Sequence, residues 1–149
     1  MLPSANLKLF PAVYEAQLAA EKASLEAAET AGLDPLLVDL VKIRASQLNG
    51  CAYCLRMHTR DALEKGETVD RIAVLAAWWE SQYFTAQERA ALLLTERITQ
   101  IGDDHAAAPL PIDVTAVLDE KQVTAVTVLA ITINTWNRIA ITSHYPVKP

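Results

Sequence analysis

The chain has 149 residues, of which 52% are hydrophobic, so it can bury a substantial core and is expected to form a single domain over residues 1–149. Its formal net charge of -5, with no local run of lysine or arginine, argues against a nucleic-acid partner. No apolar stretch near the start has signal-peptide length, and none elsewhere reaches about 18 residues, so a cytoplasmic protein without a membrane span is expected.

Alanine and leucine are plentiful and aromatic residues make up 6% of the chain, a balance that favours helices over sheets. A first helix is predicted over residues 14–29, with Leu18 and Leu25 on its apolar stripe. The pair Asp34 and Pro35 combines a capping side chain with a proline suited to the first helical position. This pair predicts a second helix over about residues 36–48.

The dipeptide Asn49–Gly50 predicts a turn between the second helix and a third one. Residues 51–65 contain neither glycine nor proline, and Gly66 follows them as a helix stop. The second and third helices are therefore expected to form a hairpin around the turn at Gly50.

Four further helices are expected after Gly66. Thr68 can cap a fourth helix with Trp79 on its apolar stripe, and Thr85 opens a capping-box pattern that predicts a fifth helix to about Ile101. A long loop is expected over residues 102–111, followed by a short helix that Asp113 caps and that ends at Leu118.

Residues 123–140 are rich in β-branched side chains, which favour strands, yet their apolar positions keep helical spacing over a length unusual for a strand. A last helix is therefore predicted there, and the whole chain is predicted to be all-α.

Both cysteines lie in the pattern Cys51–Ala–Tyr–Cys54, at the predicted start of the third helix. Residues three apart on a helix are neighbours, with Cα atoms roughly 5 Å apart, a separation that a disulfide tolerates. The partial positive charge of a helix N-terminus favours a thiolate and so lowers the pKa of a cysteine. Because permanent disulfides are rare in the cytoplasm, Cys51 and Cys54 are predicted to cycle between dithiol and disulfide.

His58 lies four residues beyond Cys54, one helical turn along the same face, where an imidazole can exchange a proton with a sulfur. Asp39 and His58 lie on opposite arms of the hairpin, roughly 16 Å and 12 Å from the Gly50 turn. Because these heights agree within one turn, a proton relay of Asp39, His58 and a cysteine thiol is predicted. Counting residues leaves open whether the two helices bring these faces together.

The segment DLVKIRASQLNGCAYCLRMH, residues 39–58, resembles the core motif of the alkylhydroperoxidase D (AhpD) and carboxymuconolactone decarboxylase family. The resemblance is specific over about residues 36–66, and residues 79–92 and 134–138 are similar to the small single-domain members. It implies an all-α AhpD-like helical bundle with the CxxC pair at the N-terminus of a helix in a helical hairpin. It also implies assembly into trimers or hexamers and thiol-dependent peroxidase activity in antioxidant defence.

The resemblance also implies roles for individual residues. The family's second cysteine forms the sulfenic acid while the first supplies a proton and closes the disulfide, roles that fall to Cys54 and Cys51. The family's glutamate and histidine relay protons, and they match Asp39 and His58. Helix-dipole reasoning alone favours Cys51 as the more acidic thiol. Proximity to His58 agrees with the family, so Cys54 is predicted to be the attacked sulfur.

The resemblance further predicts a small hydroperoxide as substrate and an external dithiol as reductant, either a lipoyl protein or a thioredoxin-like protein. No cofactor and no metal are expected. The predicted activity is then a thiol-dependent, peroxiredoxin-type reduction of hydroperoxides by the CxxC dithiol/disulfide cycle.

Several alternatives stay open from the sequence. Cys51, Cys54 and His58 are three potential zinc ligands, although no second CxxC or HxxxH motif completes a set of four. The same residues suit a non-catalytic module that responds to redox state or binds a metal, and Asp39 also suits a solvated charge or a partner of Lys42. A carboxymuconolactone decarboxylase-like enzyme is a further alternative, although the decarboxylase branch lacks this cysteine pair.

Overall fold

The computed structural model describes residues 1–103 and 111–148, and the described residues form α-helices and short 3₁₀ helices without a β-strand. This confirms the predicted all-α fold. The α-helices are α1 (Pro11–Thr30), α2 (Pro35–Asn49), α3 (Ala52–Glu64), α4 (Val69–Val74), α5 (Ala86–Thr99) and α6 (Glu120–Thr142). The 3₁₀ helices are η1 (Leu7–Leu9), η2 (Leu75–Ala77) and η4 (Val114–Ala116).

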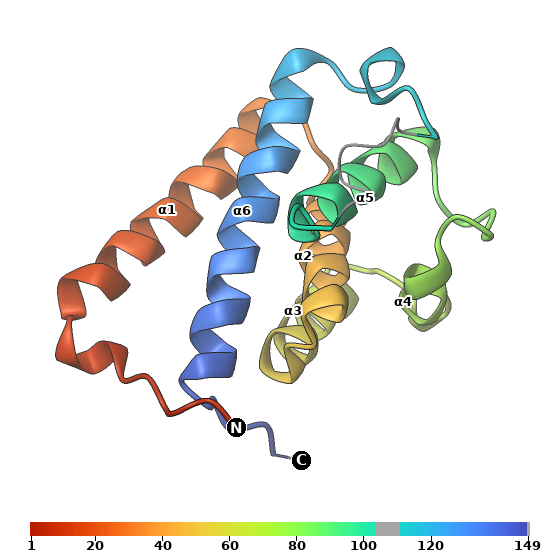
Figure 1. The fold of residues 1–149 in the computed structure, drawn as a ribbon. Coiled ribbons are helices and arrows are strands. Elements are labelled where there is room, and N and C mark those ends of the chain that lie inside the picture. The colour runs from red at the N-terminus through yellow and green to blue at the C-terminus, as the bar shows by residue number, and fades with distance from the viewer. Residues whose placement is uncertain (104–110, 149) are drawn as a thin grey trace.

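Helix α6 runs through the middle of the molecule and packs against α1 on one side and against α2 and α5 on the other (Figure 1). Helices α2 and α3 form the predicted hairpin, and α4 lies at the side of the molecule away from α1. The two ends of the described chain lie close together, because the Ala5 amide donates a 2.7 Å hydrogen bond to the Thr142 carbonyl. Within the described ranges, none of the helices combines the length and apolar character needed to cross a membrane.

Helix α2 is the centre of the core. Every residue from Leu37 to Ser46 is buried, because α3, α5 and α6 all pack around this helix. Its apolar side chains meet Leu92 of α5 and Leu129 of α6 in one hydrophobic cluster. Since α2 is enclosed on all sides, its charged residues are buried as well, and each needs a partner.

The predicted helix caps are confirmed. The Asp34 side chain accepts a 2.7 Å hydrogen bond from the Leu36 amide, and Thr85 forms the expected capping box with Glu88. A side-chain cap of this kind stabilises a helix by about 1 kcal/mol. The sequence analysis missed a second capping box, between Asp119 and Gln122, which starts α6 three residues before the predicted helix.

Helix α1 differs from its prediction in its start and in its buried face. It begins at Pro11, since proline suits the first helical turn, where its missing N–H would be unpaired anyway. Leu18 and Leu25 on the predicted apolar stripe are 48% and 40% exposed, whereas Ser24 and Ala28 are buried against the neighbouring helices. The small residues allow close packing, so the inward face is not the most apolar one.

The fourth helix is shorter than expected and continues as η2. The tighter 3₁₀ winding changes which residues face the core, because it has 3.0 rather than 3.6 residues per turn. Trp78 is therefore buried, while Trp79, on the predicted stripe, is 51% exposed. Most of the expected loop at 102–111 falls on residues 104–110, which lie outside the described residues.

A network of amide side chains joins the end of α2 to α6 just before the cysteines. The Asn49 side-chain amide donates to the side-chain oxygens of Asn134 and Asn137, at 2.9 Å and 2.8 Å. Asn137 in turn donates a 2.9 Å hydrogen bond to the Ser46 hydroxyl. This network holds the last turn of α2 against α6, so it fixes the position from which the chain turns into the cysteine motif.

Candidate redox site

Gly50 lets the chain turn sharply from α2 into the cysteine motif, because its φ of 67° lies in the left-handed region that glycine adopts without strain. Cys51 then caps α3, and its sulfur accepts a 3.3 Å hydrogen bond from the Cys54 amide. Cys51 and Cys54 are joined by a disulfide, with their Cα atoms 5.4 Å apart. The helical spacing of the motif therefore places the two sulfurs within bonding reach.

The two cysteines differ in their access to a cavity of about 230 Å³ beside the motif, which we call the redox cavity. Cys54 lines this cavity, whereas Cys51 does not, although both are almost fully buried. The cavity wall is mainly apolar and aromatic, and its residues come from α1, α3, α6 and the segment after α6. They are Tyr14, Leu18, Glu21, Tyr53, Cys54, Met57, His58, Trp136, Ala140 and Tyr145.

His58 is a buried residue of α3 in the wall of the redox cavity, as its spacing from Cys54 predicts. Its pKa is lowered to about 4, mainly by burial and also by the Lys42 ammonium, while the carboxylates of Asp61 and Glu21 act in the opposite direction. The ring is thus neutral near pH 7. Its Nδ1 lies 3.4 Å from an Asp61 oxygen, so Nδ1 holds the proton of the neutral ring and Nε2 keeps a lone pair that can accept one.

Asp39 is buried in α2, but the contacts of its carboxylate are with Lys65 rather than with His58. The Lys65 ammonium donates a 2.7 Å hydrogen bond to Asp39 Oδ2. Burial raises the pKa of Asp39, and the nearby ammonium groups of Lys65 and Lys42 act in the opposite direction. Asp39 is absent from the cavity wall, so the structure brings Cys54 and His58 together without bringing Asp39 to them.

The carboxylate in the cavity wall is that of Glu21, which the sequence analysis did not identify. Glu21 Oε1 accepts a hydrogen bond from Lys42 Nζ, and Oε2 accepts one of 3.2 Å from the Trp136 indole N–H. Glu21 follows no motif, and it lies 30 residues before Cys51 on another helix. Lys42 of α2 was the one signal that could have indicated a carboxylate partner such as Glu21, because a charge enclosed in a helical core requires a partner.

Four aromatic side chains frame the redox cavity. Tyr14 and Trp136 meet edge to face with ring centroids 5.6 Å apart, and Tyr53 and Tyr145 do so at 5.1 Å. Burial and the neighbouring Tyr14 and Tyr53 phenols raise the pKa of Tyr145, so its phenol stays protonated. These aromatic rings give the cavity a mainly apolar surface.

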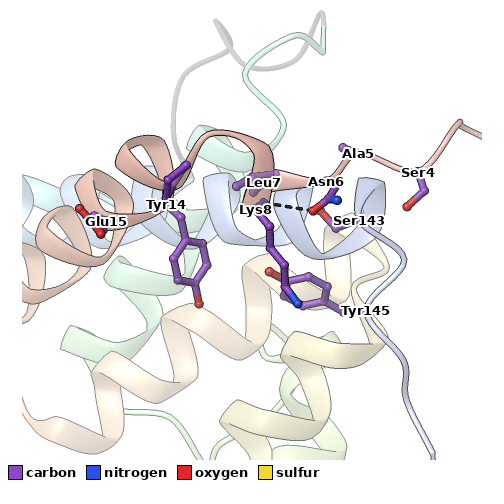
Figure 2. Close-up of a pocket in the computed structure, with 10 residues that line it drawn as sticks. Ser4, Ala5, Asn6, Leu7, Lys8, Tyr14, Glu15, Ser143 and Tyr145 are labelled. Carbon is purple, nitrogen blue, oxygen red and sulfur yellow. Dashed lines mark hydrogen bonds between the residues drawn. The ribbon is translucent and has the colours of Figure 1, made fainter.

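A larger cavity of about 620 Å³ adjoins the redox cavity, and the two share Tyr14 and Tyr145 as wall residues. Its other walls come from the N-terminal segment and from Ser143 (Figure 2). Tyr14 of α1 and Lys8 of η1 project in the same direction, towards the side on which Tyr145 lies. The shared tyrosines thus separate the sulfur site from a wider space bounded by both ends of the described chain.

Within the part of the chain that the structure describes, no group of three or more histidine, cysteine or acidic side chains has an arrangement suited to a metal ion. In this disulfide form Cys51 and Cys54 are bonded to each other, and His58 lies beside Asp61.

Comparison with known proteins places this chain in a family. The model of the carboxymuconolactone decarboxylase family matches residues 11–97. The uncharacterized protein YdfG of Bacillus subtilis is 45% identical over 103 residues, which cover 69% of this chain and 70% of YdfG. The uncharacterized protein YnjA of Escherichia coli is 31% identical over 64 residues, which are 43% of this chain but 35% of YnjA.

A solved structure shares the fold along nearly the whole chain. The crystal structure of ATU0492 from Agrobacterium tumefaciens superposes with a TM-score of 0.81 at 32% identity, over 95% of this chain and 96% of that one. ATU0492 is described as a protein of unknown function, with a suggested identity as the antioxidant defence protein AhpD. These findings confirm the resemblance drawn from residues 39–58: the chain belongs to the carboxymuconolactone decarboxylase family and has the AhpD-like helical fold.

Proposed function

We propose that the protein is a thiol-dependent peroxidase that reduces organic hydroperoxides through the Cys51–Cys54 pair. The observation that carries the proposal is the shared cavity of Cys54 and His58, which joins a redox-active sulfur to a neutral imidazole within apolar walls. Family membership and the likeness to ATU0492, with its suggested AhpD identity, support the same conclusion.

The first half of the cycle begins with both cysteines reduced. His58 Nε2 accepts the proton of the Cys54 thiol, and the thiolate attacks the terminal oxygen of the hydroperoxide. The O–O bond breaks, Cys54 becomes a sulfenic acid, and the alkoxide leaves as an alcohol with the proton from His58. The sulfur has then lost two electrons and the peroxide has gained them.

The second half of the cycle restores the dithiol. The Cys51 sulfur attacks the Cys54 sulfenic acid, water leaves, and the disulfide seen in the structure forms. An external dithiol then reduces this disulfide through a mixed disulfide and is itself oxidised. Cys51 suits the resolving role because it lies outside the cavity but within bonding distance of Cys54.

The proposal includes partners and a quaternary state. The reductant is a dithiol carried by a lipoyl or thioredoxin-like protein, and the chain assembles as a trimer or hexamer. Apolar side chains exposed along α1 support assembly, among them Val13, Leu18 and Leu25. The relay role of Asp39 stays a prediction, and because Lys65 holds its carboxylate, it would have to act without direct contact to His58.

The test is the mass and free-thiol count of the reduced protein before and after one equivalent of cumene hydroperoxide. We expect wild type to lose both thiols without gaining an oxygen, because the disulfide closes. Cys51→Ser should retain one oxygen as a sulfenic acid on Cys54, whereas Cys54→Ser should not react. Persistence of both thiols for hours, or a sulfenic acid trapped on Cys51, would contradict the proposal.

A further inference from the structure

Glu21 is the one carboxylate among the described residues that line the redox cavity. It reaches the cavity from α1, and its two oxygens are held by partners from two other helices, Lys42 of α2 and Trp136 of α6. These two hydrogen bonds fix the position of both oxygens, so the negative charge of Glu21 is held in the wall of the cavity that Cys54 also lines.

The ion pair of Glu21 and Lys42 is largely buried, since the two side chains are 22% and 7% exposed. A buried pair must overcome the cost of removing two charges from water, so it is weak evidence for a contribution to stability. On the same helix, Lys22 and Glu26 form an ordinary surface pair at 3.8 Å, which provides a natural comparison. Glu21 of the first pair lines the redox cavity, whereas Lys22 and Glu26 do not.

The charges around His58 give the buried pair a role in the reaction. When the Cys54 thiol passes its proton to His58, an imidazolium forms within the electrostatic influence of the Lys42 ammonium. A nearby ammonium disfavours this imidazolium and a nearby carboxylate favours it. Accordingly, Lys42 lowers the pKa of His58 and Glu21 raises it.

We propose that Glu21 is a positioning residue of the redox site: held by Lys42 and Trp136, it adds to the charge of Asp61 a second, cavity-lining negative charge that stabilises protonated His58 while Cys54 is a thiolate. The role of this charge in catalysis rests on the proposed peroxidase function. The effect of Glu21 on the protonation of His58 can be measured without turnover. Asp39 matches the family's glutamate in sequence, yet its carboxylate is bonded to Lys65 and lies outside the cavity wall.

Other titratable groups also act on His58 and must be held constant in any test. They come from every element packed around it: Tyr14 and Glu21 from α1, Lys42 from α2, Tyr53, Cys54 and Asp61 from α3, and Tyr145 after α6. Asp61 lies on the same helix as His58, 3.4 Å from its Nδ1, and it raises the pKa of His58 more than Glu21 does, so Asp61 stays unchanged in every variant.

The experiment follows the imidazole resonances of His58 by NMR in the reduced protein, from about pH 8 to about pH 3.5. Glu21→Gln should lower the pH at which His58 begins to titrate, by about one pH unit, and Lys42→Gln should raise it. The double variant Glu21→Gln/Lys42→Gln should return towards wild type, because it removes both charges. Glu26→Gln is the matched control and should superimpose on wild type.

Peroxide reactivity supplies the second measurement. The rate at which cumene hydroperoxide oxidises Cys54 should fall about tenfold in Glu21→Gln, the factor that one pKa unit of the base represents, and recover in the double variant. If wild type is not oxidised at all, the proposed function fails while the NMR titration still tests Glu21. Glu21→Asp keeps the charge and should titrate like wild type, so it carries the test with Lys42→Gln if Glu21→Gln does not fold.

Two outcomes would overturn the inference. If His58 titrates alike in Glu21→Gln and Glu26→Gln, Glu21 is merely a link between α1 and α2. If Asp39→Asn moves the titration of His58 and Glu21→Gln leaves it unchanged, the carboxylate of the site is Asp39.

Discussion

Asp39 and Lys65 close the α2–α3 hairpin, with a 2.7 Å hydrogen bond between a buried carboxylate and a half-exposed ammonium. Lys65 is the C-cap residue of α3, so this bond lies at the end of the helix opposite the cysteines. Lys65 is therefore the partner that the buried Asp39 carboxylate needs. The carboxylate that lines the redox cavity is that of Glu21.

Replacement of Asp39 tests the structural role of this bond. We expect Asp39→Asn to change the free energy of unfolding at pH 7 by no more than about 1 kcal/mol, because the loss of the bond is offset by the relief of a buried charge. Burial raises the pKa of Asp39, so the folded protein binds its proton more tightly than the unfolded chain does. Wild type should therefore gain stability relative to the variant as the pH falls towards this raised pKa.

Urea unfolding of both proteins at several pH values measures this difference, with Glu29→Gln on the exposed surface of α1 as the control. A difference that grows in favour of Asp39→Asn at low pH would show that the sign of the argument is wrong.

His58 makes stability depend on pH in the opposite sense. Its pKa falls from an ordinary 6.5 to about 4 on folding. Between these two pH values His58 is protonated in the unfolded chain but neutral in the folded protein. The contribution of neutral His58 to the free energy of unfolding is fully present above about pH 6.5 and is lost as the pH falls towards 4. By linkage this loss amounts to up to about 3 kcal/mol.

A non-titrating variant isolates this contribution. His58→Gln should lose less stability than wild type between neutral pH and about pH 4.5, even if it is less stable overall. Parallel stability curves for the two proteins would mean that His58 titrates normally in the folded state.

The amide network at the end of α2 offers a third prediction. Asn137→Ala removes a fully buried side chain that bonds Asn49 and Ser46, and it leaves the buried Ser46 hydroxyl and the partly buried Asn49 amide without this partner. We expect a loss of about 2–3 kcal/mol in the free energy of unfolding. Thr135→Ala, at a partly exposed position two residues earlier, should change it by less than about 0.5 kcal/mol in the same thermal or urea unfolding measurement.

Local signals were enough to predict most of the fold and half of the site. Helix starts at Asp34 and Thr85 follow from side-chain chemistry within a few residues, and Cys54 and His58 share a helix, so their spacing fixes their common face. Glu21 could not be predicted in this way, because it reaches the cavity through the packing of α1 against α6.

Asp39 shows the limit of predicting contacts across two helices. Counting residues gives the distance of Asp39 from the Gly50 turn along the helix axis. The rotation of α2 about that axis, however, decides which neighbour the Asp39 side chain contacts. That rotation depends on the burial of α2 by three helices at once, and the resulting partner of Asp39 is Lys65.

The enclosure of α2 also affects how the sequence can change during evolution. A helix with one buried face accepts exchanges at two positions of every three or four, and its variable sites form a stripe. From Leu37 to Ser46 no such stripe exists, since ten successive residues are buried. In a library of single substitutions, the intolerant positions of α2 would therefore form one unbroken block, and new properties would have to arise from the flanking helices.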